Sequence, residues 1–290
     1  MMQQIQASEP QEAVRRLCAL FRVSRSWWYA RRKAGEPSEE EVALRDAIER
    51  LVLDFPGYGY RRVTRALQRD GWQVNHKRVL RVMRHESLLC HLQRQFVVTA
   101  DSQHGYRTYP NLLAGRVVDG LDQVWVADIT YIRLPGGFVY LACILDAHSR
   151  RCIGWHLSRT IDTALALAAL DQAIATRQRA TGLIHHSDQG VQYASTAYIQ
   201  RLQAIGAQVS MSAKGNPYDN AKAESFFKTL KQEEVYLKDY ASFAEAQANL
   251  ATFIEAVYNA KRLHSSLGYL PPNEFEAAYR LQIVTTQVVR

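Results

Sequence analysis

The first third of the chain shows the periodicity of short amphipathic helices. Residues 11–29 place apolar side chains every three or four positions on either side of a tight turn, a pattern typical of a helix-turn-helix segment. A polar stretch at 33–41 with Pro and Gly indicates a linker. A second helical unit follows it, with helices expected at 44–52, 61–69 and 75–85. Residues 96–119 show no clear period and are interpreted as a connector.

After Gly120 the apolar pattern changes to that of β-strands. Three apolar runs joined by short turns, at 124–132, 138–145 and 151–157, predict an antiparallel meander. Helices and strands then alternate, with a helix at 162–177, a strand at 183–186, a helix at 196–204 and a strand at 207–211. Ser242 and Glu245 form a capping box that opens a further helix. This order predicts an α/β fold with a mixed five-stranded sheet flanked by helices, in which three antiparallel strands precede helix-linked parallel strands.

Length and composition indicate a globular protein of more than one domain. The chain has 290 residues, of which 47% are hydrophobic and 22% charged, values that exclude disordered and fibrous classes. No apolar run approaches the roughly 18 residues that span a membrane, and four isolated cysteines favour a reducing compartment, so a cytoplasmic location is expected. The expected parts are a helix-turn-helix-like segment (1–36), a basic helical domain (37–95), the connector (96–119), the α/β core (120–280) and a tail (281–290).

Positive charge is concentrated in the first part of the chain. Residues 1–117 carry 20 Lys and Arg against 12 Asp and Glu, whereas residues 118–290 carry 16 of each. Within 61–94, nine basic residues accompany only two acids, a density that favours a polyanion such as DNA as the partner. A solvated helix face or a protein-interaction module is the alternative interpretation. The candidate DNA contacts are Arg61, Arg62, Arg65, Lys77, Arg78, Arg81 and Arg84.

Two aspartates of the α/β core are candidates for a catalytic site. Asp128 lies inside an apolar strand, where an ionised carboxylate is costly unless it is paired or bound to a cation. Asp188 directly follows the strand predicted at 183–186, at the edge where open α/β sheets place their sites. A turn or helix-cap aspartate is the alternative for Asp188.

A glutamate further along the chain completes the candidate site. Asn216 and Pro217 have the pattern of a helix start, which places Glu224 about two turns into a helix. An ordinary i,i+4 pair with Lys228 is the alternative role for Glu224. Lys228 and Lys231 extend the same helix face toward any DNA that reaches the site.

The three carboxylates together predict a site for divalent ions. They would supply hard oxygen ligands from a central strand, a neighbouring strand end and a helix, a set that suits Mg²⁺ or Mn²⁺. Two such ions about 3.5–4 Å apart would clamp the attacking and leaving oxygens of a phosphoryl transfer. Asp128 is the expected bridging ligand.

Other polar side chains have simpler interpretations. Of the adjacent His185 and His186, one is expected to be buried and the other to lie near the site. Turn chemistry explains Asp146. Asn220 either caps the helix or orients water near the third carboxylate.

The sequence around the three carboxylates resembles the catalytic core of DDE transposases and retroviral integrases. Asp128 stands in WVADITYI, Asp188 in HHSDQGVQY and Glu224 in NPYDNAKAESFFKTLK, and 35 residues separate the second from the third. More closely, the chain is similar to the OrfB-type transposases of insertion-sequence family three. That similarity extends from about residue 17 to 279, through YGYRRVTRALQRDGWQVNHKRVLRVMR, PNLL, LDAHSRRCIGW and YNAKRLHSSLGYLPPNEFE.

The resemblance implies an RNase H-like catalytic domain and a metal-dependent DNA transposase. The implied reactions are hydrolytic cleavage at the 3′ ends of the element and attack of the freed 3′-OH on target DNA, with two Mg²⁺ ions that Mn²⁺ can replace. Lys231 occupies the position where this group carries a basic residue that holds the DNA end. The implied partners are element and target DNA, further copies of the chain in a multimer, and an OrfA-type protein.

Two other functions are consistent with the pattern. One is an RNase H-like nuclease without strand transfer, and the other is a DNA-binding regulator with an inactive core. The three intact carboxylates speak against the inactive regulator. The end sequence, the target preference and the stoichiometry do not follow from the sequence.

Overall fold

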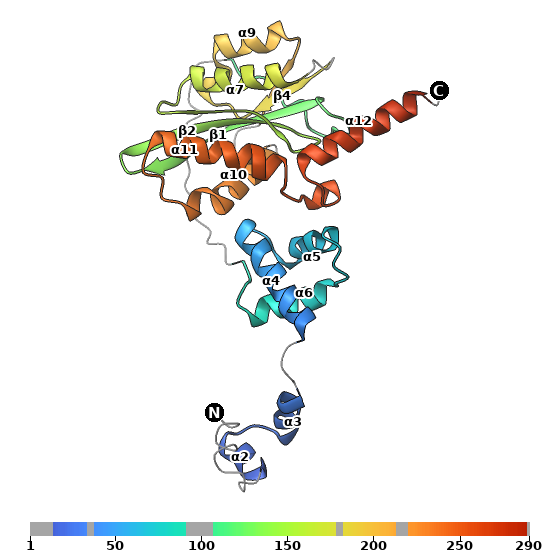
Figure 1. Ribbon diagram of the computed structural model, residues 1–290. Helices are drawn as coiled ribbons and strands as arrows, with labels where there is room; N and C mark the ends of the chain where they lie inside the picture. The colour runs from blue at the N-terminus through green and yellow to red at the C-terminus, as the bar shows by residue number, and fades with distance from the viewer. Residues whose placement is uncertain (1–13, 34–37, 91–106, 178–181, 213–219, 289–290) are drawn as a thin grey trace. The chain divides into compact units, whose positions relative to one another are not determined.

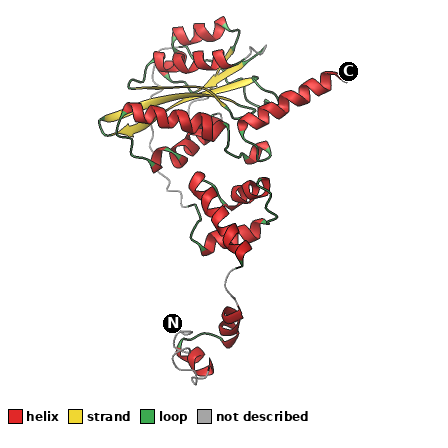
Figure 2. Cartoon of the chain, in the orientation of Figure 1, coloured by secondary structure: helices red, strands yellow, loops and turns green. Residues whose placement is uncertain are grey.

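The computed structural model describes residues 14–33, 38–90, 107–177, 182–212 and 220–288. The chain forms two compact units, Met1–Arg50 and Leu51–Arg290. Figure 2 shows that the strands are gathered in one sheet, whereas the earlier part of the chain is helical. No helix within the described ranges has both the length and the apolar character needed to cross a bilayer.

The first unit contains a helix pair and most of a longer helix. Helices α2 (Val14–Leu20) and α3 (Arg25–Lys33) lie where the helix-turn-helix pattern predicts them. The Ser24 hydroxyl caps α3 by accepting a hydrogen bond from the Trp27 amide at 3.0 Å. Helix α4 (Glu39–Asp54) buries Leu44 and Ile48, members of the apolar stripe that predicted it.

The second unit begins with the two helices of the basic region. Helices α5 (Tyr60–Arg69) and α6 (His76–His85) pack on each other and bury one apolar face each. Asn75 caps α6 by accepting a hydrogen bond from the Arg78 amide at 2.9 Å, as the sequence predicts. The apolar faces hold the two helices together and leave most of the basic side chains at the surface.

The core of the second unit is a mixed five-stranded sheet in the order β3-β2-β1-β4-β5. Strands β1 to β3 form the predicted antiparallel meander, while β4 and β5 run parallel to β1. The strands are β1 (Val124–Leu134), β2 (Gly137–Asp146), β3 (Cys152–Ser158), β4 (Ile184–Ser187) and β5 (Gln208–Met211). Both predicted features, five strands and mixed direction, are therefore confirmed.

Helices cover both faces of the sheet (Figure 1). Helices α7 (Thr163–Thr176), α8 (Val191–Ala194) and α9 (Thr196–Ala204) pack on one face, and α10 (Ala221–Glu233) and α11 (Phe243–Thr252) pack on the other. Alternate residues of β1 point to opposite faces: Val124 and Val126 join the cluster under α10, and Trp125 and Ala127 join the cluster under α7. The central strand is thus buried on both sides.

One glycine allows a helix to lie close to the sheet. A Cβ atom on Gly154 in β3 would lie 2.2 Å from the Ala169 carbonyl oxygen of α7. No other residue type fits this contact without moving the helix.

The chain after α10 wraps around the same unit. It forms a 3₁₀ turn η1 (Val235–Leu237), α11, a π-helical segment η2 (Phe253–Asn259), a second 3₁₀ turn η3 (Ser265–Leu267) and α12 (Pro272–Val288). The Ser242 and Glu245 cap is present at α11, with Glu245 reaching the Ala241 amide at 2.8 Å. Helix α12 crosses the domain boundary predicted at residue 280.

Candidate active site

Asp128 lies on the central strand β1, opposite Cys143 of β2. One carboxyl oxygen accepts a hydrogen bond from the neighbouring Ile129 amide at 2.8 Å. Burial raises the pKa of Asp128 to about 8, and the nearby Asp188 carboxylate raises it next most strongly. A carboxyl group whose ionised form the fold stabilises so little is suited to bind a cation.

Asp188 lies one residue after the end of β4. Strands β1 and β4 are parallel, with Trp125 opposite His185 and Val126 opposite His186, so the register continued by two residues brings Asp188 level with Asp128. A carboxyl oxygen of Asp188 accepts a hydrogen bond from the Gly190 amide at 2.9 Å, which orients the side chain in the loop before α8.

Glu224 lies in the first turn of α10, since the described helix begins at Ala221. The expectation that it lies about two turns inside a helix is therefore wrong, and the predicted cap at Asn216 and Pro217 lies outside the described residues. Four apolar side chains of α10, among them Ala223 and Phe226, pack on the sheet and fix the helix beside β1. Glu224 itself is exposed.

The three predicted carboxylates act on one another electrostatically. Asp188 and Glu224 both raise the pKa of Asp128, which requires that their charges lie near it. Within the described ranges, no group of three His, Cys, Asp or Glu side chains is already arranged to hold a metal ion. The fold therefore brings the three carboxylates to one region without closing them into a cage.

Lys231 lies beside the same region. Its ammonium group stands 4.5 Å from the centre of the Tyr131 ring of β1, and its positive charge lowers the pKa of Asp128. Burial lowers the pKa of Lys231, while Asp128 acts in the opposite direction. Lys228, one turn earlier on α10, is exposed.

Asn220 connects the start of α10 to the central strand. Its side-chain amide donates a hydrogen bond to the Ala127 carbonyl at 3.3 Å, adjacent to Asp128. Asn220 stands at the N-cap position of α10, as one of the two interpretations expects, but its side chain makes no capping hydrogen bond. The side-chain Oδ1 atom of Asn220 is buried without a hydrogen-bond partner in the part of the chain that the structure describes.

The remaining polar candidates of the core have structural partners. Asp146 is fully buried and accepts hydrogen bonds from the backbone amides of Asp122, His148 and Ser149, which confirms its role in the turn. The structure buries both His185 and His186, where the sequence predicts only one. The reason is that each ring has its own buried partners, Tyr198 for His185 and two serines of the β5 region for His186.

The basic candidates on α5 and α6 differ in their surroundings. Arg61, Arg65, Lys77, Arg81 and Arg84 are exposed, and Arg78 is partly exposed. Arg65 lies over the Tyr269 ring at 5.3 Å. Arg62, in contrast, turns toward the core and lines a polar pocket there, together with Arg150, Arg262 and His264.

Sequence reasoning missed this pocket. Arg150 stands in LDAHSRRCIGW, and Arg262 and His264 stand in YNAKRLHSSLGYLPPNEFE. These two motifs support the family resemblance, and their polar residues are the signal that could have identified the pocket. Only the fold shows that Arg150, Arg262 and His264 lie around the same pocket as Arg62 of α5.

Comparison with known proteins gives the family. Two family models described as an integrase core domain match residues 120–217 and 205–272, and a model described as an HTH-like domain matches residues 39–96. The transposase for insertion sequence element IS904 of Lactococcus lactis is 37% identical over 85% of this chain and 98% of that protein. Transposase InsF for insertion sequence IS3A of Escherichia coli is 34% identical over 94% of this chain and 96% of that protein.

The chain is also similar in part to solved structures. The Mos1 transposase catalytic domain solved with Mg has a TM-score of 0.40 and 16% identity, covering 47% of this chain and 72% of that one. The catalytic core domain of BIV integrase has a TM-score of 0.40 and 17% identity, covering 56% of this chain and 99% of that one.

The family models and the sheet order together confirm the predicted RNase H-like α/β core and the predicted helix-turn-helix-like region. An integrase core implies polynucleotidyl transferase activity, and an HTH-like domain implies DNA binding. On the extent and identity of these matches, the chain belongs to the family of IS3-type insertion-sequence transposases.

Proposed function

We propose that this transposase cleaves the DNA strand at the 3′ ends of its element and joins each freed 3′-OH to a target strand, with Asp128, Asp188 and Glu224 as the catalytic carboxylates. The observation that carries the proposal is the mutual influence of these three charges, which come from a strand, a strand end and a helix far apart in sequence. A purely structural aspartate in β1 would have a cation or several donors as partners, as Asp146 has.

The donor set fits Mg²⁺, with Mn²⁺ as a substitute. All three side chains supply hard oxygen ligands, and burial, followed by the charges of Asp188 and Glu224, raises the pKa of Asp128. Glu224 is exposed and can change rotamer toward Asp128 without disturbing the packing of α10. When bound, two divalent ions would stabilise the attacking and the leaving oxygen of the phosphoryl transfer.

The chain's basic residues would bind and orient DNA. Lys231, which lies over the Tyr131 ring and interacts electrostatically with Asp128, would hold a terminal phosphate beside the carboxylates, and Lys228 would extend that contact along α10. The basic surface of α5 and α6 would bind the DNA backbone through Arg61, Arg65, Lys77, Arg78, Arg81 and Arg84. We further propose that copies of the chain assemble on paired element ends, with an OrfA-type protein as partner or fusion.

A joining assay tests the proposal against a nuclease without strand transfer. Purified protein is given Mg²⁺, a precleaved element end and a plasmid target. The proposal predicts joined product with the unchanged chain and with the control Asp239→Asn, which alters an exposed aspartate of the same unit. Asp128→Asn should give no joined product. Cleavage without any joining would instead establish the nuclease function.

A further inference from the structure

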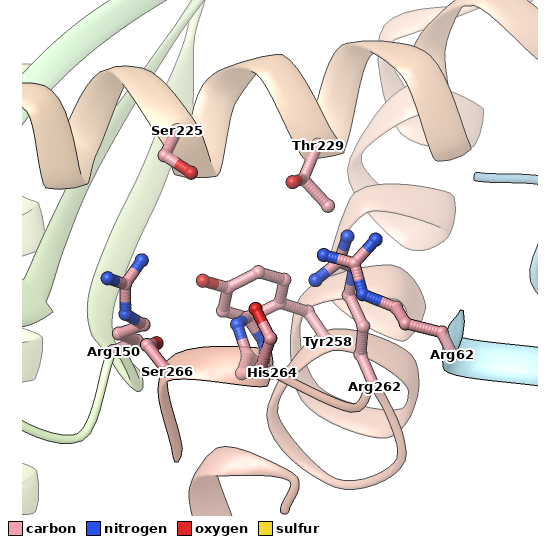
Figure 3. A pocket seen from close by; sticks show the side chains of 9 residues that line it. Arg62, Arg150, Ser225, Thr229, Tyr258, Arg262, His264 and Ser266 are labelled. Atoms are coloured by element: carbon pink, nitrogen blue, oxygen red, sulfur yellow. The ribbon is translucent and has the colours of Figure 1, made fainter. Parts of the chain in front are cut away.

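A small polar pocket lies on another side of α10 from the carboxylate site. Its volume is about 160 Å³, and Figure 3 shows Ser225 and Thr229 of α10 pointing into it from one side with arginine and histidine side chains opposite. At about 100° per residue, Ser225 and Thr229 lie roughly a third of a turn around the helix from Glu224. The lining residues are Arg62, Arg150, Ser225, Thr229, Tyr258, Arg262, His264, Ser265 and Ser266.

Buried contacts hold Arg62 at this pocket. The turn before α5 approaches the core so closely that a Cβ atom on Gly57 would meet the Glu233 side chain. The Tyr58 hydroxyl, fully buried, accepts a hydrogen bond from the Leu263 amide at 2.7 Å. These contacts, which lie within the second unit, anchor the start of α5 and therefore the position of Arg62.

The pocket has more positive than negative charge. Arg262 is neutralised, since it forms a two-fold ion pair with Glu233, both N–O distances being 2.8 Å. Arg62 and Arg150 form no ion pair within the described part of the chain. The buried Nε of Arg62 also lacks a hydrogen-bond partner there. Burial, followed by the charge of Arg262, lowers the pKa of Arg62. Keeping this guanidinium charged at the pocket therefore costs free energy.

A buried histidine adds an unpaired polar group to the pocket. His264 is only 6% exposed, and its Nε2 atom has no hydrogen-bond partner among the described residues. Burial and then the three surrounding arginines lower the pKa of His264 to about 2, so the ring is neutral and can donate one N–H. Unpaired buried polar groups are rare in native folds, and the two at this cavity, on Arg62 and His264, are suited to bind a ligand.

The donors select a particular kind of ligand. Guanidinium groups, serine and threonine hydroxyls and an imidazole surround the cavity, and they complement an anion whose oxygens only accept hydrogen bonds. Donors approach from α5, from the turn before β3, from α10 and from the segment around η3, which suits a tetrahedral anion better than a planar carboxylate. The volume is below the roughly 300 Å³ typical of pockets for larger organic ligands.

We propose that this pocket binds one backbone phosphate of the DNA substrate. This assignment rests on the proposed function, because it assumes that the protein binds DNA. It adds a second contact point to the one at Lys231, with Ser225 and Glu224 adjacent on α10. A strand bound at both places would align the helical region and the catalytic carboxylates on the same DNA.

The test measures DNA binding by the full chain in EDTA, so that no cleavage contributes. Arg150→Gln removes one pocket charge while keeping a similar stem, and Arg116→Gln is the matched control, because Arg116 is exposed and does not line the pocket. We expect Arg150→Gln to weaken DNA binding about tenfold and to reduce the slope of log K against log salt by about one. Thr229→Val should weaken binding about threefold, the loss of one hydrogen bond.

A methylphosphonate scan of the DNA locates the contact. One neutral linkage should weaken binding of the unchanged protein about tenfold and leave Arg150→Gln without further loss, because the same contact is already absent. Additive losses at every linkage would overturn the proposal. So would binding of inorganic phosphate in the pocket, measured by calorimetry, with DNA affinity unaffected by Arg150→Gln, since that result indicates a small-anion site. Both measurements are independent of cleavage, so a failure here leaves the catalytic proposal standing.

Discussion

Three charge clusters in the second unit differ in whether the fold balances them. Around Glu276, which is 2% exposed, the donors Arg177, Ser149 and Arg151 satisfy both carboxyl oxygens. Around Asp128 negative charge exceeds positive charge, and around Arg62 the reverse holds. A balanced cluster can stabilise the fold by itself. An unbalanced cluster can be neutralised by a ligand of opposite charge. We assign divalent cations to the cluster around Asp128 and a phosphate to the cluster around Arg62.

The largest expected effect is a loss of catalysis when the charge of Asp128 is removed. Asp128→Asn keeps the shape of the side chain and removes its charge, so metal-dependent cleavage and joining should fall by at least ~10³-fold, the loss of several kcal/mol of transition-state stabilisation. DNA retention in a gel-shift assay should be unchanged. Equal loss of binding and cleavage would show that Asp128 acts in folding instead.

A structural effect is expected next, at the balanced cluster. Glu276→Gln removes the closer of the two carboxylates paired with the buried Arg177 guanidinium and leaves only Asp122, at 3.6 Å, so we expect the free energy of unfolding to fall by about 3–5 kcal/mol in a denaturant titration. Glu274→Gln is the control, because its ion pair with Arg69 is exposed and contributes at most ~1 kcal/mol. If both variants lose the same small amount, the buried cluster has no special role.

The effect at Lys231 should be smaller and purely functional. Lys231→Ala removes the ammonium group between Tyr131 and Asp128, and we expect joining to fall about tenfold, equivalent to one charge-assisted contact. Lys228→Ala removes an exposed charge one turn away and should change joining about twofold. The comparison is made on precleaved ends at fixed salt, and a larger loss for Lys228→Ala would reverse the roles of the two lysines.

The smallest expected effect is on acid stability. Burial alone would raise the pKa of Glu276, but the Arg177 hydrogen bond and charge outweigh it and lower the pKa below its ordinary value of 4.5. The ionised form is therefore bound more strongly in the folded state, and its stabilisation is full above pH about 4.5 and lost as pH falls through the folded pKa. Relative to the unchanged chain, Glu276→Gln should flatten the fall of melting temperature below pH 4.5. An unaltered slope would assign the acid sensitivity to other groups.

Much of the core could be predicted because its signals are local. Alternating apolar residues mark each strand, and Asp128 interrupts one of these runs, so both the strand and its unusual carboxylate are visible in a few residues. Asp188 is equally local, since it follows an apolar strand directly. The parallel pairing that brings the two together was implied by the helices between them.

What could not be predicted depends on contacts between distant segments. The sequence pattern groups Arg62 with the surface arginines of its helix, because nothing near it in sequence shows that the Leu263 amide, 205 residues from Tyr58, donates a hydrogen bond to the Tyr58 hydroxyl. The burial of both His185 and His186 depends on Tyr198 and on two serines beyond α9. Periodicity places side chains on faces, but it does not show which segment covers each face.

The central claim is that three carboxylates from separate elements hold divalent ions together. Anomalous diffraction from a crystal of the DNA complex soaked in Mn²⁺ tests this most directly. We expect two peaks bounded by Asp128, Asp188 and Glu224, with the Asp128 carboxylate touching both ions. Peaks elsewhere, or a single ion that Glu224 does not approach, would contradict the account.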